Sequence, residues 1–270
     1  MGRPKWAGVA LAACATILAL STRAEHGGPA ASAASSDRQA RLPPVMLWGW
    51  ERSEDLRFIN PKQMGVAYLD RTIRLKNGRV EVRPRMQPLL VPPGTTLLAV
   101  VRIESGRPLR VHPRSDPPPQ FTSSETQRAV EAIAGLAGQP GLAGVQIDFD
   151  AAAFERVFYR NLLVEVRRRM PSRLTLSMTA LASWCMGDDW IEGLPVDEAV
   201  PMLFRMGPDR STVLNHLENG ASFRARLCQE SAGISTDEPV IGLGPRRYYI
   251  FCPQPWSQTA FDQIRREVLP

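Results

Sequence analysis

"LAGVQIDFD" occupies residues 142–150, and from Val145 onward it alternates apolar and polar side chains. In a β-strand, side chains two residues apart share a face, so Gln146, Asp148 and Asp150 are predicted to point the same way. The apolar residues between them face the opposite side and can pack against helices. Carboxylates are costly to bury without partners, so we expect this strand to end at a cleft.

Seven other apolar stretches resemble this one in length, and they are predicted to be buried strands. They lie at 44–51, 64–70, 95–105, 173–184, 196–207, 238–244 and 246–252. Helical patterns or long connections separate most of them. Eight buried strands of this kind predict an α/β fold, a (β/α)8 TIM-type barrel. The barrel is irregular, since Asn77-Gly78 predicts a hairpin after the second strand.

The N-terminal 24 residues have the pattern of a secretory signal peptide. Arg3 and Lys5 precede an apolar run over residues 6–20, and small residues follow it. The run is too short and wrongly flanked for a typical membrane span. We therefore expect an exported protein, periplasmic or secreted, with no membrane span in the mature chain. Lipoprotein anchoring through Cys14, in "LAAC", is the alternative.

The remaining chain divides into two parts. Residues 25–41 are rich in Ala, Ser and Gly and are predicted to be a flexible lead-in. Residues 42–270 are long enough for a sizeable core and are predicted to form a single TIM-type barrel domain. We expect this domain to be a monomer.

The charge pattern argues against a nucleic-acid partner. The chain has 33 basic and 27 acidic residues, a net charge of +6. Residues 1–24 hold three basic residues and no acid, so 30 against 27, or +3, remain after processing. Nucleic-acid binders usually concentrate basic residues on one face, whereas here the two signs are interspersed.

Three cysteines remain after the predicted signal peptide, which allows one disulfide and one free thiol in an oxidising compartment. We favour the pair Cys185–Cys228. No metal site is predicted, because the chain has no CxxC or HxxxH spacing and only His112 and His216 lie in the predicted domain. No cofactor is predicted either.

Barrel enzymes build their active sites at the carboxyl ends of the strands. Asp148 and Asp150 are predicted to lie there as the catalytic pair. Aromatic rings, one glutamate, two arginines and one methionine are predicted at the other strand ends. They are Trp48, Trp50, Glu51, Tyr68, Arg102, Trp184, Met202, Arg205 and Trp256. Rings stack on sugar faces and carboxylates act on glycosidic oxygens, so this set predicts a carbohydrate ligand or substrate.

The same segments resemble family-18 glycoside hydrolases, the chitinase-like barrels. "GVQIDFD" is similar to their fourth-strand motif DxxDxDxE, with Asp148 at the third acidic position and Asp150 at that of the catalytic acid. "PMLFR" resembles their sixth-strand MxYD, with Phe204 and Arg205 replacing its Tyr and Asp. The resemblance implies Asp150 as general acid. It does not extend to the substrate-assisted reaction, which needs the replaced carboxylates.

Four motifs resemble a bacterial domain family of unknown function, numbered 3142, over residues 45–256. They are "VMLWGWER", "GVQIDFDA", "LTLSMTALASWC" and "DEAVPMLFRMG". This resemblance implies an exported or envelope-associated barrel and brings no activity with it.

Three functions remain open on the sequence. The first is a glycoside hydrolase with Asp150 as general acid, Asp148 as its partner, and Arg205, Glu51 and the tryptophans holding the sugar. The second is a non-catalytic barrel that binds carbohydrate of the cell envelope. The third is a purely structural envelope protein.

Overall fold

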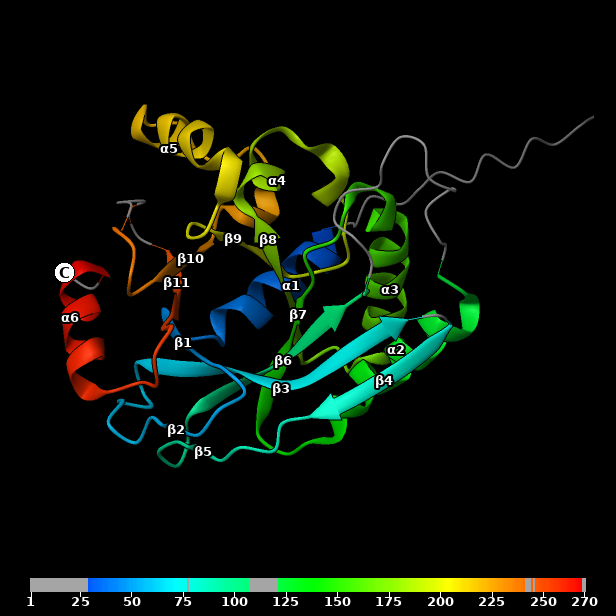
Figure 1. The fold of residues 1–270 in the computed structure, drawn as a ribbon, viewed down its shortest axis with the longest axis horizontal. Coiled ribbons are helices and arrows are strands. Elements are labelled where there is room, and N and C mark those ends of the chain that lie inside the picture. Colours follow the sequence, from blue (N-terminus) through cyan, green and yellow to red (C-terminus); the bar gives the residue numbers. More distant parts are fainter. Residues whose placement is uncertain (1–28, 77, 107–120, 241–243, 245, 269–270) are drawn as a thin grey trace, which may run out of the picture.

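A computed structural model describes residues 29–268, except 77, 107–120, 241–243 and 245. Eight parallel strands pair in chain order, and the first closes the sheet by pairing with both the last and the second (Figure 1). Helices separate most of the later strands. The predicted (β/α)8 barrel is therefore confirmed.

The barrel strands are short and mostly buried. They are β1 (Val45–Gly49), β3 (Met64–Lys76), β6 (Thr96–Glu104), β7 (Leu142–Asp148), β8 (Thr175–Leu181), β9 (Glu198–Met202), β10 (Ser231–Ser235) and β11 (Arg247–Phe251). Two further short strands, β2 (Glu54–Asp55) and β5 (Leu89–Leu90), pair with each other outside the barrel.

The outer helices lie beside the strands that they follow (Figure 1). They are α2 (Ser123–Ala134), α3 (Arg156–Arg169), α4 (Ala182–Gly187), α5 (Arg210–Glu218) and α6 (Gln258–Val268). Single 3-10 turns are η1 (Gly135–Gly138), η2 (Ala153–Glu155), η3 (Asp189–Ile191), η4 (Gly207–Asp209) and η5 (Arg226–Cys228). The predicted capping box of α2 is present, with Glu125 and Thr122 bonding reciprocally.

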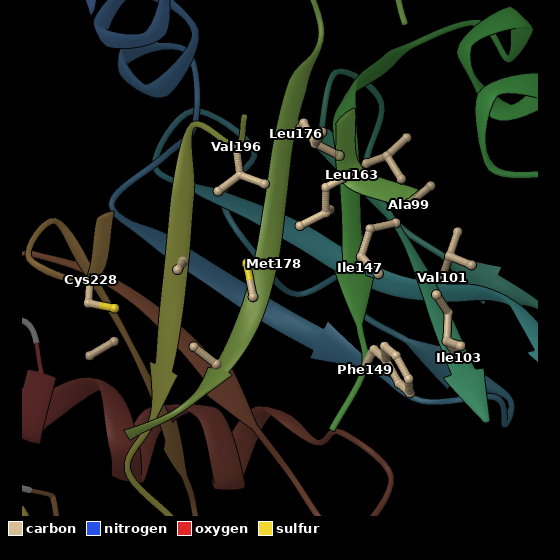
Figure 2. Packing of buried hydrophobic residues seen from close by; sticks show 14 of the residues in the cluster. Ala99, Val101, Ile103, Ile147, Phe149, Leu163, Leu176, Met178, Val196 and Cys228 are labelled. Carbon is tan, nitrogen blue, oxygen red and sulfur yellow. The ribbon is translucent and has the colours of Figure 1, made fainter. Parts of the chain in front are cut away.

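Strand alternation divides the core into two layers. Ile147 of β7 and Phe149, which directly follows that strand, pack outward with Met178 of β8 and Leu163 of α3 (Figure 2). Gln146 points into the barrel and donates to Ser177 Oγ at 2.9 Å. This is the face assignment predicted for 142–150. Gly144 permits the close β7–β8 approach, because a Cβ there would clash with the Thr175 carbonyl oxygen.

The second barrel strand continues beyond the barrel as a hairpin. β3 pairs antiparallel with β4 (Arg79–Pro84), and Gly78 has a φ of 74° at the turn. The predicted hairpin is therefore confirmed. It replaces the helix that would normally follow the second strand, and it carries Arg83 back along β3 toward the barrel.

Two strand predictions are wrong. The seventh strand is Ser231–Ser235, not 238–244, and of the latter stretch 241–243 lie outside the described residues. The fifth strand ends at Leu181, and the chain then turns into α4. Trp184 is consequently on a helix rather than at a strand end.

The predicted flexible lead-in is also corrected in part. Residues 29–40 form helix α1 (Pro29–Ala40), which lies against the amino ends of the strands. Its Arg38 binds the buried carboxylate of Asp197 with Nε at 3.0 Å and Nη2 at 2.6 Å. Arg247, the first residue of β11, donates to the backbone of Gln39 and Leu42. These bonds fix α1 over the end of the barrel opposite Asp148.

The structure contains the disulfide Cys185–Cys228, with the two Cα atoms 5.9 Å apart. It ties α4 to η5, and Cys252 is a buried free cysteine.

Replacing both Cys185 and Cys228 with alanine is expected to lower the free energy of unfolding by about 4 kcal/mol. The bond closes a loop of 43 residues, which restricts the unfolded chain by roughly that amount. Chemical denaturation of the double variant and of Cys252→Ala, the matched buried cysteine, measures the effect. A loss no larger than that of Cys252→Ala would contradict it.

Candidate functional site

Asp148 is the last residue of β7 and points into the barrel mouth. Its carboxylate accepts a hydrogen bond from Thr179 Oγ1 of β8 at 2.9 Å. Arg102 of β6 approaches the other carboxylate oxygen at 3.5 Å. The side chain is 13% exposed, so the carboxylate is largely removed from water while keeping two partners.

Asp150 lies two residues beyond the strand and is exposed. A cavity of about 170 Å³ is lined by both aspartates together with Arg102, Ser105 and Gly106. We call it the acid cavity. The structure thus brings together the two predicted catalytic residues and one predicted binding residue, at the carboxyl end of the strand as expected.

The pKa of Asp148 is raised to about 6, mainly by burial and also by the negative charge of Asp150, while Arg102 and the hydrogen bond from Thr179 oppose the rise. Desolvation also raises the pKa of Asp150, and Arg102 opposes it. The charge of Asp150 thus acts on Asp148, so the two carboxyls are electrostatically coupled. Asp148 holds its proton at a pH where an isolated aspartate has lost it.

A larger cavity of about 520 Å³ adjoins the acid cavity, and Arg102 lines both. We call it the arginine cavity. Its polar lining consists of Glu51, Arg52, Thr72, Arg83, Arg102, Glu104 and Arg205. Four predicted site residues, Trp50, Glu51, Arg102 and Arg205, therefore share one cavity.

Aromatic rings form the apolar part of this cavity. Trp50 is half-buried and lines it beside Phe251 of β11. Trp48 is fully buried beneath them and stacks on Phe251, with ring centroids 4.3 Å apart. Trp50 is therefore the tryptophan of the predicted set that a ligand in this cavity can reach, while Trp48 supports it from inside the barrel.

Arg205 has a φ of 50°, the one positive φ of a non-glycine residue in the described part of the chain. This conformation is disfavoured for a side chain with a Cβ. The carboxylate of Glu238 accepts from its backbone N–H at 2.8 Å, and Asp237 accepts from its guanidinium at 2.9 Å. Strained residues cluster at functional sites, and this one lies on the rim of the arginine cavity.

Four predicted binding residues lie away from both cavities. Tyr68 faces outward, and its hydroxyl is 3.4 Å from Gln139. Trp184 packs in the outer core against Trp190. Trp256 is buried and donates from its indole to the Trp48 carbonyl at 2.8 Å. Met202 packs against the interior layer.

The first three positions follow from local geometry. Tyr68 has the outward parity of Met64 and Val66 on β3. The fifth strand ends at Leu181, so Trp184 lies on helix α4 and its side chain packs in the outer core. Trp256 follows β11, and its indole bonds the backbone of Trp48 in β1. We correct their predicted role to packing.

Sequence reasoning missed two residues at the mouth. Thr179 has the inward parity of β8, and counting alternate residues from Ser177 could have identified it. Arg83 comes from the β4 arm of the hairpin and bonds Glu51 at 3.1 Å. No feature of the sequence shows that this arm lies beside the mouth.

Within the described ranges, no group of three or more His, Cys, Asp or Glu side chains is placed to hold a metal ion. No helix in those ranges has the length and hydropathy to cross a bilayer.

Asp148→Asn is expected to stabilise the fold above pH 7 by up to about 3 kcal/mol. The native carboxyl has a pKa of about 6, against 3.8 for an unperturbed aspartate, so the folded state keeps its proton longer than the unfolded chain does. The contribution of Asp148 to stability therefore falls as pH rises from about 4 to about 6. Asparagine removes this dependence.

Urea denaturation at pH 4 and pH 8 measures the difference between Asp148→Asn and the wild type. Asp55 is the matched control, because its hydrogen bond from the Arg57 side chain lowers its pKa to about 2. The free energy of unfolding of Asp55→Asn should fall relative to that of the wild type as pH rises, which is opposite to the change expected for Asp148→Asn. A difference for Asp148→Asn that does not grow with pH would contradict the raised pKa.

The chain was also compared with known proteins. No family model matches it, and no curated protein matches it. Among solved structures, it is similar to the Bacillus cereus spore cortex-lytic enzyme SleL, with 17% sequence identity and a TM-score of 0.46. The match covers 83% of this chain and 57% of that one, so the chain spans less than two thirds of that enzyme. The likeness assigns neither activity nor substrate to this chain.

Proposed function

We propose that this protein is an exported glycoside hydrolase that acts on a polysaccharide or oligosaccharide, with Asp150 as general acid and Asp148 as its partner. The observation that supports the proposal best is the acid cavity. It places an exposed carboxyl and a desolvated one together at the carboxyl end of a barrel strand. Paired carboxyls in a cleft are the groups that glycosidic bond hydrolysis uses.

Hydrolysis adds one water across the glycosidic bond and needs a proton on the departing sugar oxygen. Asp150 is the member of the pair exposed to the cavity, so it is the proposed donor. Asp148, held by Thr179 and Arg102, keeps its proton up to about pH 6 because burial disfavours its charged form. Desolvation raises the pKa of Asp150 as well, the direction that a general acid requires.

The arginine cavity is the proposed binding site for the sugar. Trp50 offers a ring face, and Glu51 and Arg205 offer hydrogen bonds to hydroxyl groups. Export is part of the proposal and rests on the signal-peptide pattern, with which the Cys185–Cys228 disulfide is compatible. Membership of domain family 3142 also remains a proposal.

One observation favours a second candidate, a non-catalytic carbohydrate-binding barrel. Both oxygens of Asp148 already have partners within the protein, Thr179 on one and Arg102 on the other. A carboxylate satisfied in this way can serve to shape a binding site.

A screen against polysaccharides distinguishes the two. The mature protein and its Asp148→Asn/Asp150→Asn double variant are incubated with a panel of plant, bacterial and animal glycans, and released reducing ends are counted. Cleavage by the wild type and none by the double variant is the expected result. Binding of a glycan by both proteins without cleavage would replace the hydrolase with the binding barrel, and no binding would remove both.

A further inference from the structure

Three arginines from three different elements converge on the arginine cavity. Arg83 comes from β4, Arg102 from β6 and Arg205 from the turn after β9. Their side chains are 48%, 39% and 55% exposed. Long cationic side chains that remain accessible on three sides of one cavity are well placed to meet a ligand.

The contacts of these arginines differ from those of Arg52, which also lines the cavity. Arg52 donates to Glu54 at 2.7 Å and to the backbone carbonyls of Pro253 and Cys252 at 2.8 and 2.9 Å. Its guanidinium is therefore committed to the fold.

Arg83 and Arg205 are each held by one acid, Glu51 at 3.1 Å and Asp237 at 2.9 Å. Arg102 lies 3.5 Å from Asp148 and 3.8 Å from Glu104. A guanidinium has five N–H donors, so these contacts fix its position and leave donors for a ligand.

The lining of the cavity has more basic than acidic side chains, while three acids outside the lining, Glu54, Asp148 and Asp237, pair with its arginines. Its lining holds four arginines, at 52, 83, 102 and 205, against two acids, Glu51 and Glu104, which gives a formal charge of +2. The β3–β4 hairpin beside it adds Arg74, Lys76 and Arg79 against Glu81.

A neutral sugar does not need this arrangement, since hydroxyl groups are bound as well by amides and carboxylates. The planar fork of a guanidinium matches the two oxygens of a carboxylate, and a bidentate pair of this kind is among the stronger hydrogen-bonded contacts in proteins. Trp50 and Phe251 supply ring faces beside the arginines. The combination fits a pyranose ring that carries a carboxylate.

We propose that the glycan bound in the arginine cavity is acidic and that Arg83 and Arg205 hold its uronic acid carboxylates. This inference rests on the proposed function in taking the ligand to be a glycan. It adds the chemical class of that glycan, which the acid cavity alone does not specify.

The test measures binding to the Asp150→Asn variant by isothermal titration calorimetry, so that turnover does not interfere. The ligands are oligosaccharides from polygalacturonate, alginate and hyaluronan, each beside its carboxyl-reduced derivative with the same linkages. At least one acidic glycan should bind about tenfold or more tightly than its reduced form. Arg83→Gln/Arg205→Gln, added to Asp150→Asn, should weaken that binding by a similar factor.

The matched control adds Arg57→Gln/Arg168→Gln to Asp150→Asn. It removes two exposed charges that line neither cavity. Its binding should equal that of Asp150→Asn alone. Thermal unfolding of each variant checks that the fold is retained. If Arg57→Gln/Arg168→Gln weakens binding as much as Arg83→Gln/Arg205→Gln does, the attraction is non-specific and the inference is overturned.

The remaining outcomes separate this inference from the proposed function. Acidic glycan bound at the arginines but not cleaved by the wild type supports the inference and removes the hydrolase. Neutral glycans bound or cleaved as well as acidic ones, with no effect of the arginine changes, overturn the inference and leave the hydrolase standing. No binding of either class overturns both.

Discussion

Asp150→Asn should reduce the rate of glycan cleavage by about 10²- to 10⁴-fold, the contribution expected of a positioned general acid. An amide cannot supply the proton that the departing sugar oxygen needs, but it keeps nearly the same volume and exposure. Binding should therefore change little, so the loss is expected in kcat rather than KM. Initial rates over a range of glycan concentrations measure both.

Asp55→Asn is the control, because Asp55 is exposed, pairs with Arg57 and lines neither cavity. Its rate should match that of the wild type. The wild-type rate should fall as pH rises through the raised pKa values of the two carboxyls, because the general acid loses its proton there. A residual rate in Asp150→Asn above one tenth of the wild type would exclude Asp150 as the acid.

Asp197→Ala should lower the free energy of unfolding by about 3 to 5 kcal/mol, the usual cost of removing one partner from a buried ion pair. The Asp197 side chain is 2% exposed and accepts hydrogen bonds from Ser35 and Arg38 of α1 and from the Leu176 amide. Arg167 of α3 also reaches it, at 3.4 Å. Alanine would leave these donors without their carboxylate partner.

Urea denaturation of Asp197→Ala, Arg38→Gln and the combined variant forms a double-mutant cycle for this contact. The two substitutions should be strongly non-additive, since each breaks the same pair. Hydrogen exchange should also speed up in α1 of both single variants, because the pair is one of the contacts that fix the helix to the barrel. A loss below about 1 kcal/mol for Asp197→Ala would show that α1 is held by other contacts.

Local patterns predicted much of the fold because their physical causes are local. The alternation of 142–150 placed Ile147 outward and Asp148 inward, and Asn77-Gly78 marked the hairpin turn. The Cys185–Cys228 pair was also identified. The alternation has a period of two residues, the turn is marked by one dipeptide, and three cysteines allow only three pairings. Each of these features is visible in the sequence alone.

The seventh strand was missed because its sequence, "SAGIS", consists mostly of small residues typical of loops. Its size is set by its neighbours. A Cβ at Gly233 would lie 3.0 Å from Met202 and 3.4 Å from Phe251, which fill the barrel interior at that level. The longer apolar run at 238–244 was predicted to be the seventh strand instead. Packing across the barrel decides such a position, and a single sequence does not record it.

The site was predicted in its acids and only partly in its binding residues. Asp148 and Arg102 lie opposite each other on adjoining strands, and Asp150 follows two residues after Asp148 with the same parity in the sequence. Trp184 was predicted at the barrel mouth but packs in the outer core, because the chain turns from β8 into α4 before this residue and its side chain takes another direction. Arg83 was missed because its place at the mouth depends on where a hairpin folds back.

The coupling of Asp148 and Asp150 is the central claim, and a carboxyl NMR titration tests it without any knowledge of the substrate. The ¹³C shift of the Asp148 carboxyl is followed with pH in the wild type and in Asp150→Asn. Asp148 should titrate near pH 6 in the wild type and at a lower pH in the variant, because the charge of Asp150 contributes to its raised pKa. An Asp148 that titrates near pH 4 in both proteins would contradict the account.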